Sequence, residues 1–171
     1  EFKKLLQDIV PKDLSDCVRF GVMVETTEAL KNIKEIAPLC DCLCYGTNDL
    51  TEQITGLSRS IWDYTQWMQE RGYEGQSPFE VLVPKVAQPV FKSMNEARTV
   101  NPKIIINMCG HQTGGHHISS VDEAFAMNVD QITLPPFSEN INRTKLALAR
   151  YEARKLLAPE LANSRSVSHH A

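Results

Sequence analysis

Short apolar segments that alternate with helical segments constrain the fold of this chain more than any other feature. The expected strands lie at about Val18–Val24, Asp41–Tyr45, Lys103–Met108 and Gln131–Leu134. Three expected helices lie at about Thr27–Ile36, Pro78–Thr99 and Glu139–Leu157. A fourth begins at a cap formed by Asn48 or Asp49, and a fifth runs from a cap at Ser119 or Ser120 to about Met127. Strands that alternate with helices form a parallel sheet covered by helices. The sequence therefore predicts an α/β fold.

The rest of the chain adds two ends and one long connection. Glu1–Ile9 has the apolar spacing of a helix, and the polar, aromatic segment Gly56–Ser77 is long enough to be a lid or a binding loop. Residues 158–171 are rich in Ser and His at their end, which is typical of a frayed tail. We therefore expect one domain over residues 1–157 and a tail over 158–171.

Charge and composition argue against two classes of partner. The net charge of −3 gives no reason to expect a polyanion, and no basic stripe accompanies the aromatic residues Trp62, Tyr64 and Trp67. No apolar run approaches the roughly 20 residues that cross a membrane. We therefore expect neither a nucleic-acid partner nor a membrane.

The cysteines indicate a reducing compartment. Cys40, Cys42 and Cys44 are spaced two apart, which would place all three on one face of a strand. That spacing fits neither a disulfide framework nor the usual zinc pattern. Small buried side chains in the cytoplasm, or in an organellar matrix or stroma, are the favoured interpretation.

Chemically useful residues follow the predicted strands. Glu25 follows the first strand, Asn48 and Asp49 follow the second, and Cys109 follows the third. In parallel β/α folds the chemistry lies at the carboxyl ends of the strands. Two carboxylates suit Mg²⁺, which prefers oxygen ligands and keeps several positions for water or substrate. The thiol could exchange a proton with a carbon atom, although an inert buried cysteine is the default interpretation.

The turn at Gly46 has two interpretations. A tight glycine turn at a helix start exposes backbone N–H groups, and these suit an anionic carboxylate or phosphate. A plain turn followed by an Asn or Asp cap explains the same residues, and composition alone favours it slightly. Both interpretations stay open at this point.

The chain resembles the phosphoenolpyruvate-utilising enzymes over about residues 18–149. The matching motifs are GTNDLT at 46–51 followed by GLSR at 56–59, MVE at 23–25, and MCG at 108–110 followed by two glycines at 114–115. The segment SPFEVL at 77–82 is most similar to the pyruvate phosphate dikinase branch. The chain departs from the family pattern at Thr27 (usually Pro), at Glu52 (usually Gln), and in one extra residue before the two glycines.

The resemblance implies the C-terminal half of a (β/α)8 barrel, present here as about four βα units. It implies Glu25 and Asp49 as ligands of Mg²⁺, Cys109 as the acid/base at C3 of the enolate, and a substrate site formed by Gly46, Thr47, Asn48, Asp49 and Gly110. It also implies that a phosphoryl group moves between the enolate oxygen of phosphoenolpyruvate or pyruvate and a phosphohistidine.

A full barrel of this type takes about 250 residues, so the chain supplies one half. The N-terminal barrel half and the phosphohistidine domain are expected in the same longer chain or in a partner, and a homodimer is possible. A catalytically degenerate half-barrel that serves as a structural or interaction subunit is the alternative.

Overall fold

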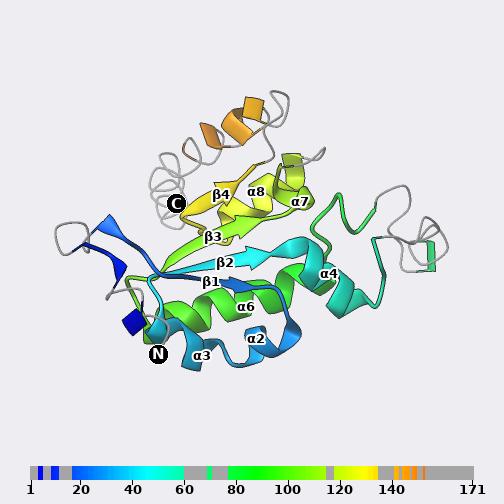
Figure 1. Cartoon of the computed structure of the whole chain (residues 1–171). Coiled ribbons are helices and arrows are strands. Elements are labelled where there is room, and N and C mark those ends of the chain that lie inside the picture. Colours follow the sequence, from blue (N-terminus) through cyan, green and yellow to red (C-terminus); the bar gives the residue numbers. More distant parts are fainter. Residues whose placement is uncertain are drawn as a thin grey trace, which may run out of the picture.

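Four parallel strands form the centre of the protein. The computed structural model describes residues 4–5, 9–11, 17–59, 69–70, 77–114, 118–134, 141–142, 144–146, 148–149 and 152. The strands are β1 (Gly21–Val24), β2 (Cys42–Gly46), β3 (Ile105–Cys109) and β4 (Gln131–Thr133), and they pair in the order β1-β2-β3-β4 (Figure 1). A doubly wound sheet reverses its strand order, whereas a barrel adds strands in sequence. The α/β fold with a barrel-type parallel sheet is therefore confirmed.

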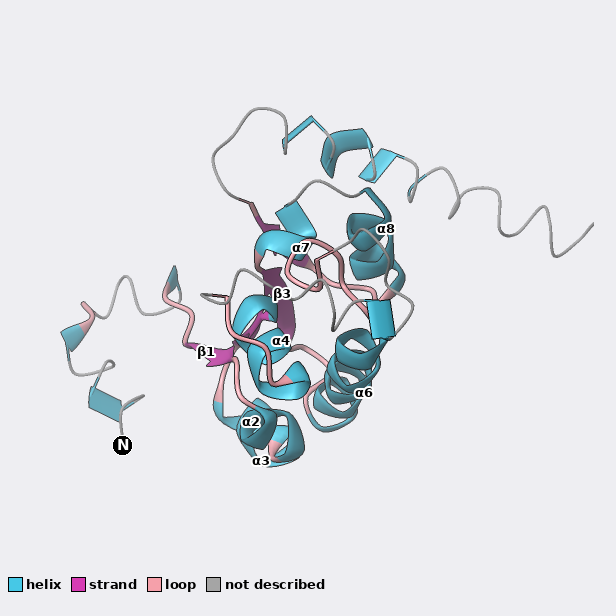
Figure 2. Ribbon diagram, turned by 90° about the vertical axis from the view of Figure 1, so that its right-hand side faces the viewer, coloured by secondary structure: helices cyan, strands magenta, loops and turns pink. Residues whose placement is uncertain are grey.

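The helices pack as a layer against this sheet. They are α2 (Thr27–Lys31), α3 (Ile33–Ile36), the 3₁₀ turn η2 (Ala37–Leu39), α4 (Thr47–Thr55), α6 (Pro84–Val100), α7 (His111–Gly114) and α8 (Ile118–Ala126). The long helix α6 contacts α2, α3 and α4, and these helices lie together in Figure 2. Of the helices that the structure describes, none has both the length and the apolar character needed to cross a bilayer.

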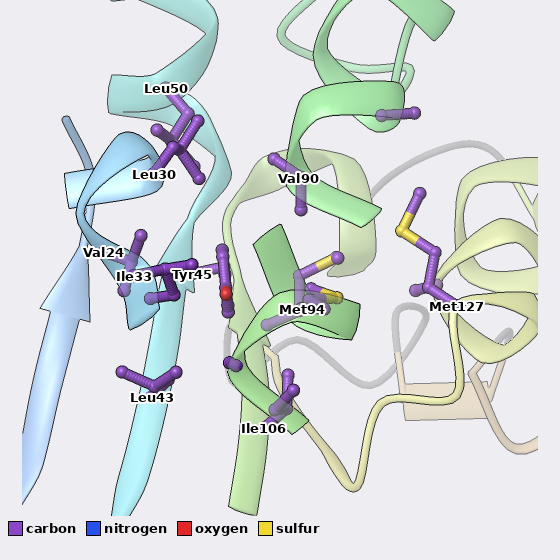
Figure 3. Packing of buried hydrophobic residues seen from close by; sticks show 14 of the residues in the cluster. Val24, Leu30, Ile33, Leu43, Tyr45, Leu50, Val90, Met94, Ile106 and Met127 are labelled. Atoms are coloured by element: carbon purple, nitrogen blue, oxygen red, sulfur yellow. The ribbon is translucent and has the colours of Figure 1, made fainter. Parts of the chain in front are cut away.

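One face of the sheet is the core face, and every second strand residue points into it. Its central side chains are fully buried: Val24, Leu43, Tyr45, Ile106 and Met108. Figure 3 shows the first four in one cluster with Val90 and Met94 of α6. The Tyr45 hydroxyl lies 3.0 Å from the Ser93 hydroxyl, which satisfies a polar group inside this core. Burial raises the pKa of Tyr45 to about 12, so the phenol stays neutral.

Two predicted helices have different bounds in the structure. The helix expected at Thr27–Ile36 is interrupted at Asn32, which ends α2 and precedes α3. The helix expected from Pro78 begins at Pro84, because the backbone amides of Glu80 and Val81 turn back to the Ser77 carbonyl instead. Pro84 suits a first helical position, since proline has no N–H to donate there.

The predicted caps are wrong. Gly46 is the N-cap of α4, so Asn48 and Asp49 lie inside the first turn of that helix. Ser119 and Ser120 lie inside α8, and the Ser120 hydroxyl accepts a 3.1 Å hydrogen bond from the Leu82 amide. Ser and Asn also bond to distant backbone groups, which short sequence windows do not contain.

The three clustered cysteines do not share one face. Cys40 precedes β2 and is 3% exposed in the hydrophobic core, with its sulfur 3.6 Å from the Ile36 carbonyl oxygen. Cys42 and Cys44 lie in β2 on the opposite face from Leu43 and are half-buried. The prediction of buried apolar side chains therefore holds for Cys40 alone.

Several predictions fall on residues that the structure does not describe. These concern most of the helix at 1–9, most of the loop at 56–77, most of the helix at 139–157, and the tail at 158–171.

Candidate functional site

A row of residues crosses the carboxyl edge of the sheet. Gly46 pairs with Cys109, and Cys109 pairs with Thr133. Val24 pairs with Tyr45, so Glu25, the next residue, reaches the level of Gly46. A Cβ atom built on Gly46 would lie 3.1 Å from the Cβ of Glu25, which shows how closely Glu25 approaches β2. The fold thus brings Glu25 and Cys109 to one edge, as the strand order predicted.

These residues lie on the opposite side from the core face. Because successive strand residues point to opposite faces, the neighbours of the buried Val24, Tyr45 and Met108 point the other way. We call this side the polar face, defined by Glu25, Cys44, Asn107, Cys109 and Thr133.

A pocket of about 270 Å³ opens at this edge. It is lined by Asn48, Cys109, Gly110, His111, Thr133 and Leu134. Its volume is just below the roughly 300–1,000 Å³ of sites for drug-sized ligands, so it suits a molecule of a few heavy atoms. Three of its lining residues were predicted site residues, whereas Thr133 and Leu134 were predicted only as the end of a strand.

The Cys109 thiol lies beside a second thiol, that of Cys44, which was not among the predicted site residues. The sulfur atoms of Cys44 and Cys109 lie 3.4 Å apart. The side-chain amide of Asn107 donates to the Cys44 sulfur at 3.0 Å and to the Thr133 hydroxyl at 2.9 Å. Alternation along β2 already placed Cys44 on a different face from Tyr45. Only the pairing of β2 with β3 shows that this face also carries Cys109.

The two thiols have opposite acid strengths. The hydrogen bond with Cys109 lowers the pKa of Cys44 to about 7, and the Asn107 amide contributes to the same shift against the effect of burial. The hydrogen bond with Cys44 raises the pKa of Cys109, and burial and the negative charges of Cys44, Glu25 and Asp49 raise it further. Cys109 therefore keeps its proton at neutral pH, while Cys44 is the thiol that ionises.

The negative charges of Glu25 and Asp49 both act on the Cys109 thiol and raise its pKa. Asp49 also accepts a 2.7 Å bond from the Arg59 guanidinium, which lies 3.4 Å from the Glu52 carboxylate. The Asp49 and Arg59 side chains are 42% and 45% exposed, so this ion pair is screened and weak. Asp49 is thus held at the edge without being sequestered.

This donor set fits Mg²⁺ in its chemistry. Both groups are carboxylates, which a hard cation prefers, and they follow neighbouring strands. Over the described ranges, no cluster of three or more His, Cys, Asp or Glu side chains surrounds a single point. A magnesium ion held by Glu25 and Asp49 would keep other positions for water and substrate, as Mg²⁺ commonly does.

Gln112 organises the loop behind the pocket. Its side chain is fully buried, accepts from the Thr47 hydroxyl at 2.6 Å, and donates to the Thr51 hydroxyl and the Pro78 carbonyl at 3.0 Å each. The Thr47 hydroxyl also lies 3.0 Å from the Cys109 carbonyl. The buried Thr47 side chain is thus committed to the loop, and a substrate role for Thr47 depends on its backbone. A single Gln in a polar loop has no pattern that predicts such a network from the sequence.

Gly110 must be glycine. Its φ of +142° disfavours any side chain, and a Cβ atom there would lie 2.0 Å from the Thr47 hydroxyl. The next residue, His111, bonds directly to α4: its backbone amide donates to the Asn48 side chain at 3.0 Å. Gly110 therefore allows the loop after β3 to close onto the start of α4. No side chain caps that helix start.

Known proteins match this chain over the same region. The family model for the PEP-binding domain of PEP-utilising enzymes matches residues 3–153. A pyruvate, phosphate dikinase of Rickettsia bellii is 31% identical over 135 residues, which is 76% of this chain and 15% of that protein. The chloroplastic enzyme of Flaveria pringlei is 31% identical over 131 residues, which is 75% of this chain and 14% of that protein.

A similar enzyme of Treponema pallidum is 27% identical over 139 residues, which is 78% of this chain and 15% of that protein. The chain therefore spans about 15% of the length of these relatives. With the family model covering most of the chain and the strand-end motifs meeting at one edge, the chain belongs to the PEP-utilising enzymes, as their PEP-binding domain.

Proposed function

We propose that this domain binds phosphoenolpyruvate or pyruvate at the carboxyl edge of its sheet and takes part in Mg²⁺-dependent phosphoryl transfer. In this proposal the phosphoryl group moves between the enolate oxygen and a phosphohistidine, as in a pyruvate phosphate dikinase. The observation that carries the proposal is the level row of Glu25, Gly46, Cys109 and Thr133, which the strand register creates beside the pocket.

The start of α4 and the pocket support binding of an anion. Gly46 gives α4 no side-chain cap, so the first-turn N–H groups can serve a carboxylate or phosphoryl oxygen. Asn48 adds an amide at the pocket wall, and its oxygen is oriented by the His111 backbone. Thr47 and Gly110 position the two loops that carry these groups.

Cys109 is the proposed acid and base at carbon. With its pKa raised, it holds a proton at neutral pH and can deliver it to C3 of the enolate, leaving a thiolate. In the reverse direction this thiolate removes a proton from the methyl group of pyruvate. The neighbouring carboxylates Glu25 and Asp49 favour the protonated thiol, so the acid form of Cys109 is populated and its thiolate, once formed, is a stronger base.

Glu25 and Asp49 are the proposed ligands of Mg²⁺. The ion, when bound, supplies positive charge beside the substrate oxygens and so favours the developing negative charge. The exposed Arg59 guanidinium donates a hydrogen bond to the Asp49 carboxylate. The rest of the barrel and the phosphohistidine domain come from a longer chain or a partner, in keeping with a match to about 15% of the relatives' length.

A second candidate function is a half-barrel that serves as a structural or interaction subunit. The described sheet has four strands, whereas a closed barrel of this type has eight. In that case the polar face would meet another protein, and the carboxylates would not bind metal.

Oxalate, which mimics the enolate of pyruvate, distinguishes the two functions. Calorimetry with the 171-residue chain should show oxalate binding that requires Mg²⁺. Asp49→Asn should weaken that binding by at least about 100-fold, because it removes a ligand charge from the metal. Two results would favour the structural subunit: oxalate binding that needs no Mg²⁺, or no binding of oxalate and no binding of Mg²⁺.

Glu52→Gln is the matched control. Glu52 lies in the same helix and meets the same Arg59, but it lies beyond the first turn. This substitution should leave Mg²⁺-dependent oxalate binding within about twofold.

A further inference from the structure

The proposed function uses Cys109 but gives no role to the thiol beside it. Cys44 and Cys109 lie on adjacent strands of the polar face, with their sulfur atoms 3.4 Å apart. Both side chains are half-buried rather than sealed in the core, and Cys109 lines the pocket. Two thiols this close can be joined in a disulfide when an oxidant takes up their two electrons.

We propose that Cys44 and Cys109 form a redox-sensitive pair that hydrogen peroxide converts into a reversible disulfide. In this proposal peroxide enters the pocket that Cys109 lines and meets the half-buried Cys44 sulfur, 3.4 Å from the Cys109 sulfur. The pair is a modification site that shares Cys109 with the proposed substrate site and adds Cys44, to which the proposed function gives no role.

The reaction has two steps. In the first, the Cys44 thiolate attacks one peroxide oxygen, an S–O bond forms, the O–O bond breaks, and hydroxide leaves as water after protonation. In the second, the Cys109 sulfur attacks the Cys44 sulfur, an S–S bond forms, the S–O bond breaks, and water leaves with the Cys109 proton. The two thiols lose two electrons and two protons, and one peroxide becomes two waters.

The surroundings decide which sulfur reacts first. The Asn107 amide donates to Cys44 at 3.0 Å, and the pKa of Cys44 is about 7, so the thiolate is populated at neutral pH. Cys109 keeps its proton and stays beside the oxidised sulfur as the resolving thiol. Cys42 also lies on this face of β2, but burial and the charge of Asp41 raise its pKa, so it stays a less reactive thiol.

The strand register makes the disulfide easy to reduce. Cys44 pairs with Asn107 and Cys109 pairs with Gly46, so the two cysteines are diagonal neighbours. Diagonal neighbours lie farther apart at Cα than directly paired residues, whereas disulfides usually span at most about 6.8 Å. Closure therefore requires movement where β3 ends at Cys109, and a bond closed under strain is readily reduced.

The consequence for activity depends on the proposed function. A disulfide removes both the sulfur and the proton that Cys109 would use at carbon, so oxidised protein would lose proton transfer until it is reduced. Formation of the bond itself does not depend on that function.

The experiment uses the 171-residue chain with Cys17→Ser, because Cys17 is exposed and could pair between molecules. The protein is treated with equimolar hydrogen peroxide, alkylated, digested and analysed by mass spectrometry. The expected product is a peptide pair that links Cys44 to Cys109 and that dithiothreitol separates. Cys42→Ser should keep this product, and the nearly isosteric Cys44→Ser should abolish it.

The idea fails if Cys44 and Cys109 both remain open to alkylation after oxidation, or if Cys44 links to Cys42 instead. Mg²⁺-dependent oxalate binding by the reduced protein is measured in parallel. A bond that forms in protein unable to bind oxalate would refute the proposed function and leave the redox pair intact.

Discussion

The two faces of one sheet differ completely, although the same strands build both. On the core face, Leu43 and Ile106 are fully buried under the helices. On the polar face, the neighbouring Cys44 and Asn107 are half-buried and hydrogen-bonded to each other. Alternate residues of β2 and β3 therefore serve stability and chemistry in turn. This separation allows the edge residues to vary without loss of the core.

The sharpest test of this difference compares substitutions on the two faces. Leu43→Ala should lower the free energy of unfolding by about 2–5 kcal/mol, because it leaves a cavity in a fully buried site. Met23→Ala, at a side chain that is 49% exposed on the other face of β1, should change it by about 0.5 kcal/mol or less. Urea denaturation followed by circular dichroism measures both. Equal effects would show that the two faces are buried alike.

Gly110→Ala should have the next largest effect. The new methyl group would be placed 2.0 Å from the Thr47 hydroxyl at a φ of +142°, so backbone strain and overpacking add to about 2–4 kcal/mol of destabilisation. Gly56→Ala is the matched control, since its φ is +76° but nothing lies within 4 Å of the new atom. A smaller loss is expected there, and equal losses would exclude the contact with Thr47 as the cause.

Gln112→Leu should destabilise the protein by about 1–3 kcal/mol, because it leaves the buried Pro78 carbonyl without the donor that it has now. Oxalate affinity should fall as well, since the loop after Cys109 loses the side-chain bonds of Gln112 to Thr47 and Thr51 of α4. Gln88→Leu changes the same residue type at an exposed position of α6 and should alter neither quantity. An unchanged thermal midpoint in Gln112→Leu would contradict the proposed network.

The smallest predicted effect concerns the pH at which Cys44 reacts. A depressed pKa means that the thiolate fraction rises as pH increases through about 7, so the rate of alkylation of Cys44 should rise over the same range. Asn107→Leu removes a donor to the sulfur and should move this midpoint to higher pH. Site-resolved mass spectrometry after timed alkylation measures it. A midpoint that does not move would mean that Asn107 has no effect on the thiol.

Sequence alone identified the alternation of strands and helices, the parallel sheet and the family. These features depend on periodicity and on short motifs, which a local window contains. It also placed Glu25 and Cys109 correctly at the ends of β1 and β3. The errors lie at helix ends and in the shared face predicted for Cys40, Cys42 and Cys44. Asn48 and Ser120 were predicted as caps, but they bond instead to backbone groups of residues 63 and 38 positions away along the chain.

The sequence by itself determined which residue types follow each strand, because strand period and turn chemistry are local. Only the tertiary structure decided that Cys44 faces Cys109, that Gln112 holds Thr47 in a buried network, and that Cys40 belongs to the core. Each of these depends on strand register or on burial between residues far apart in the chain. Such contacts form only when helices and strands pack, so no local pattern specifies them.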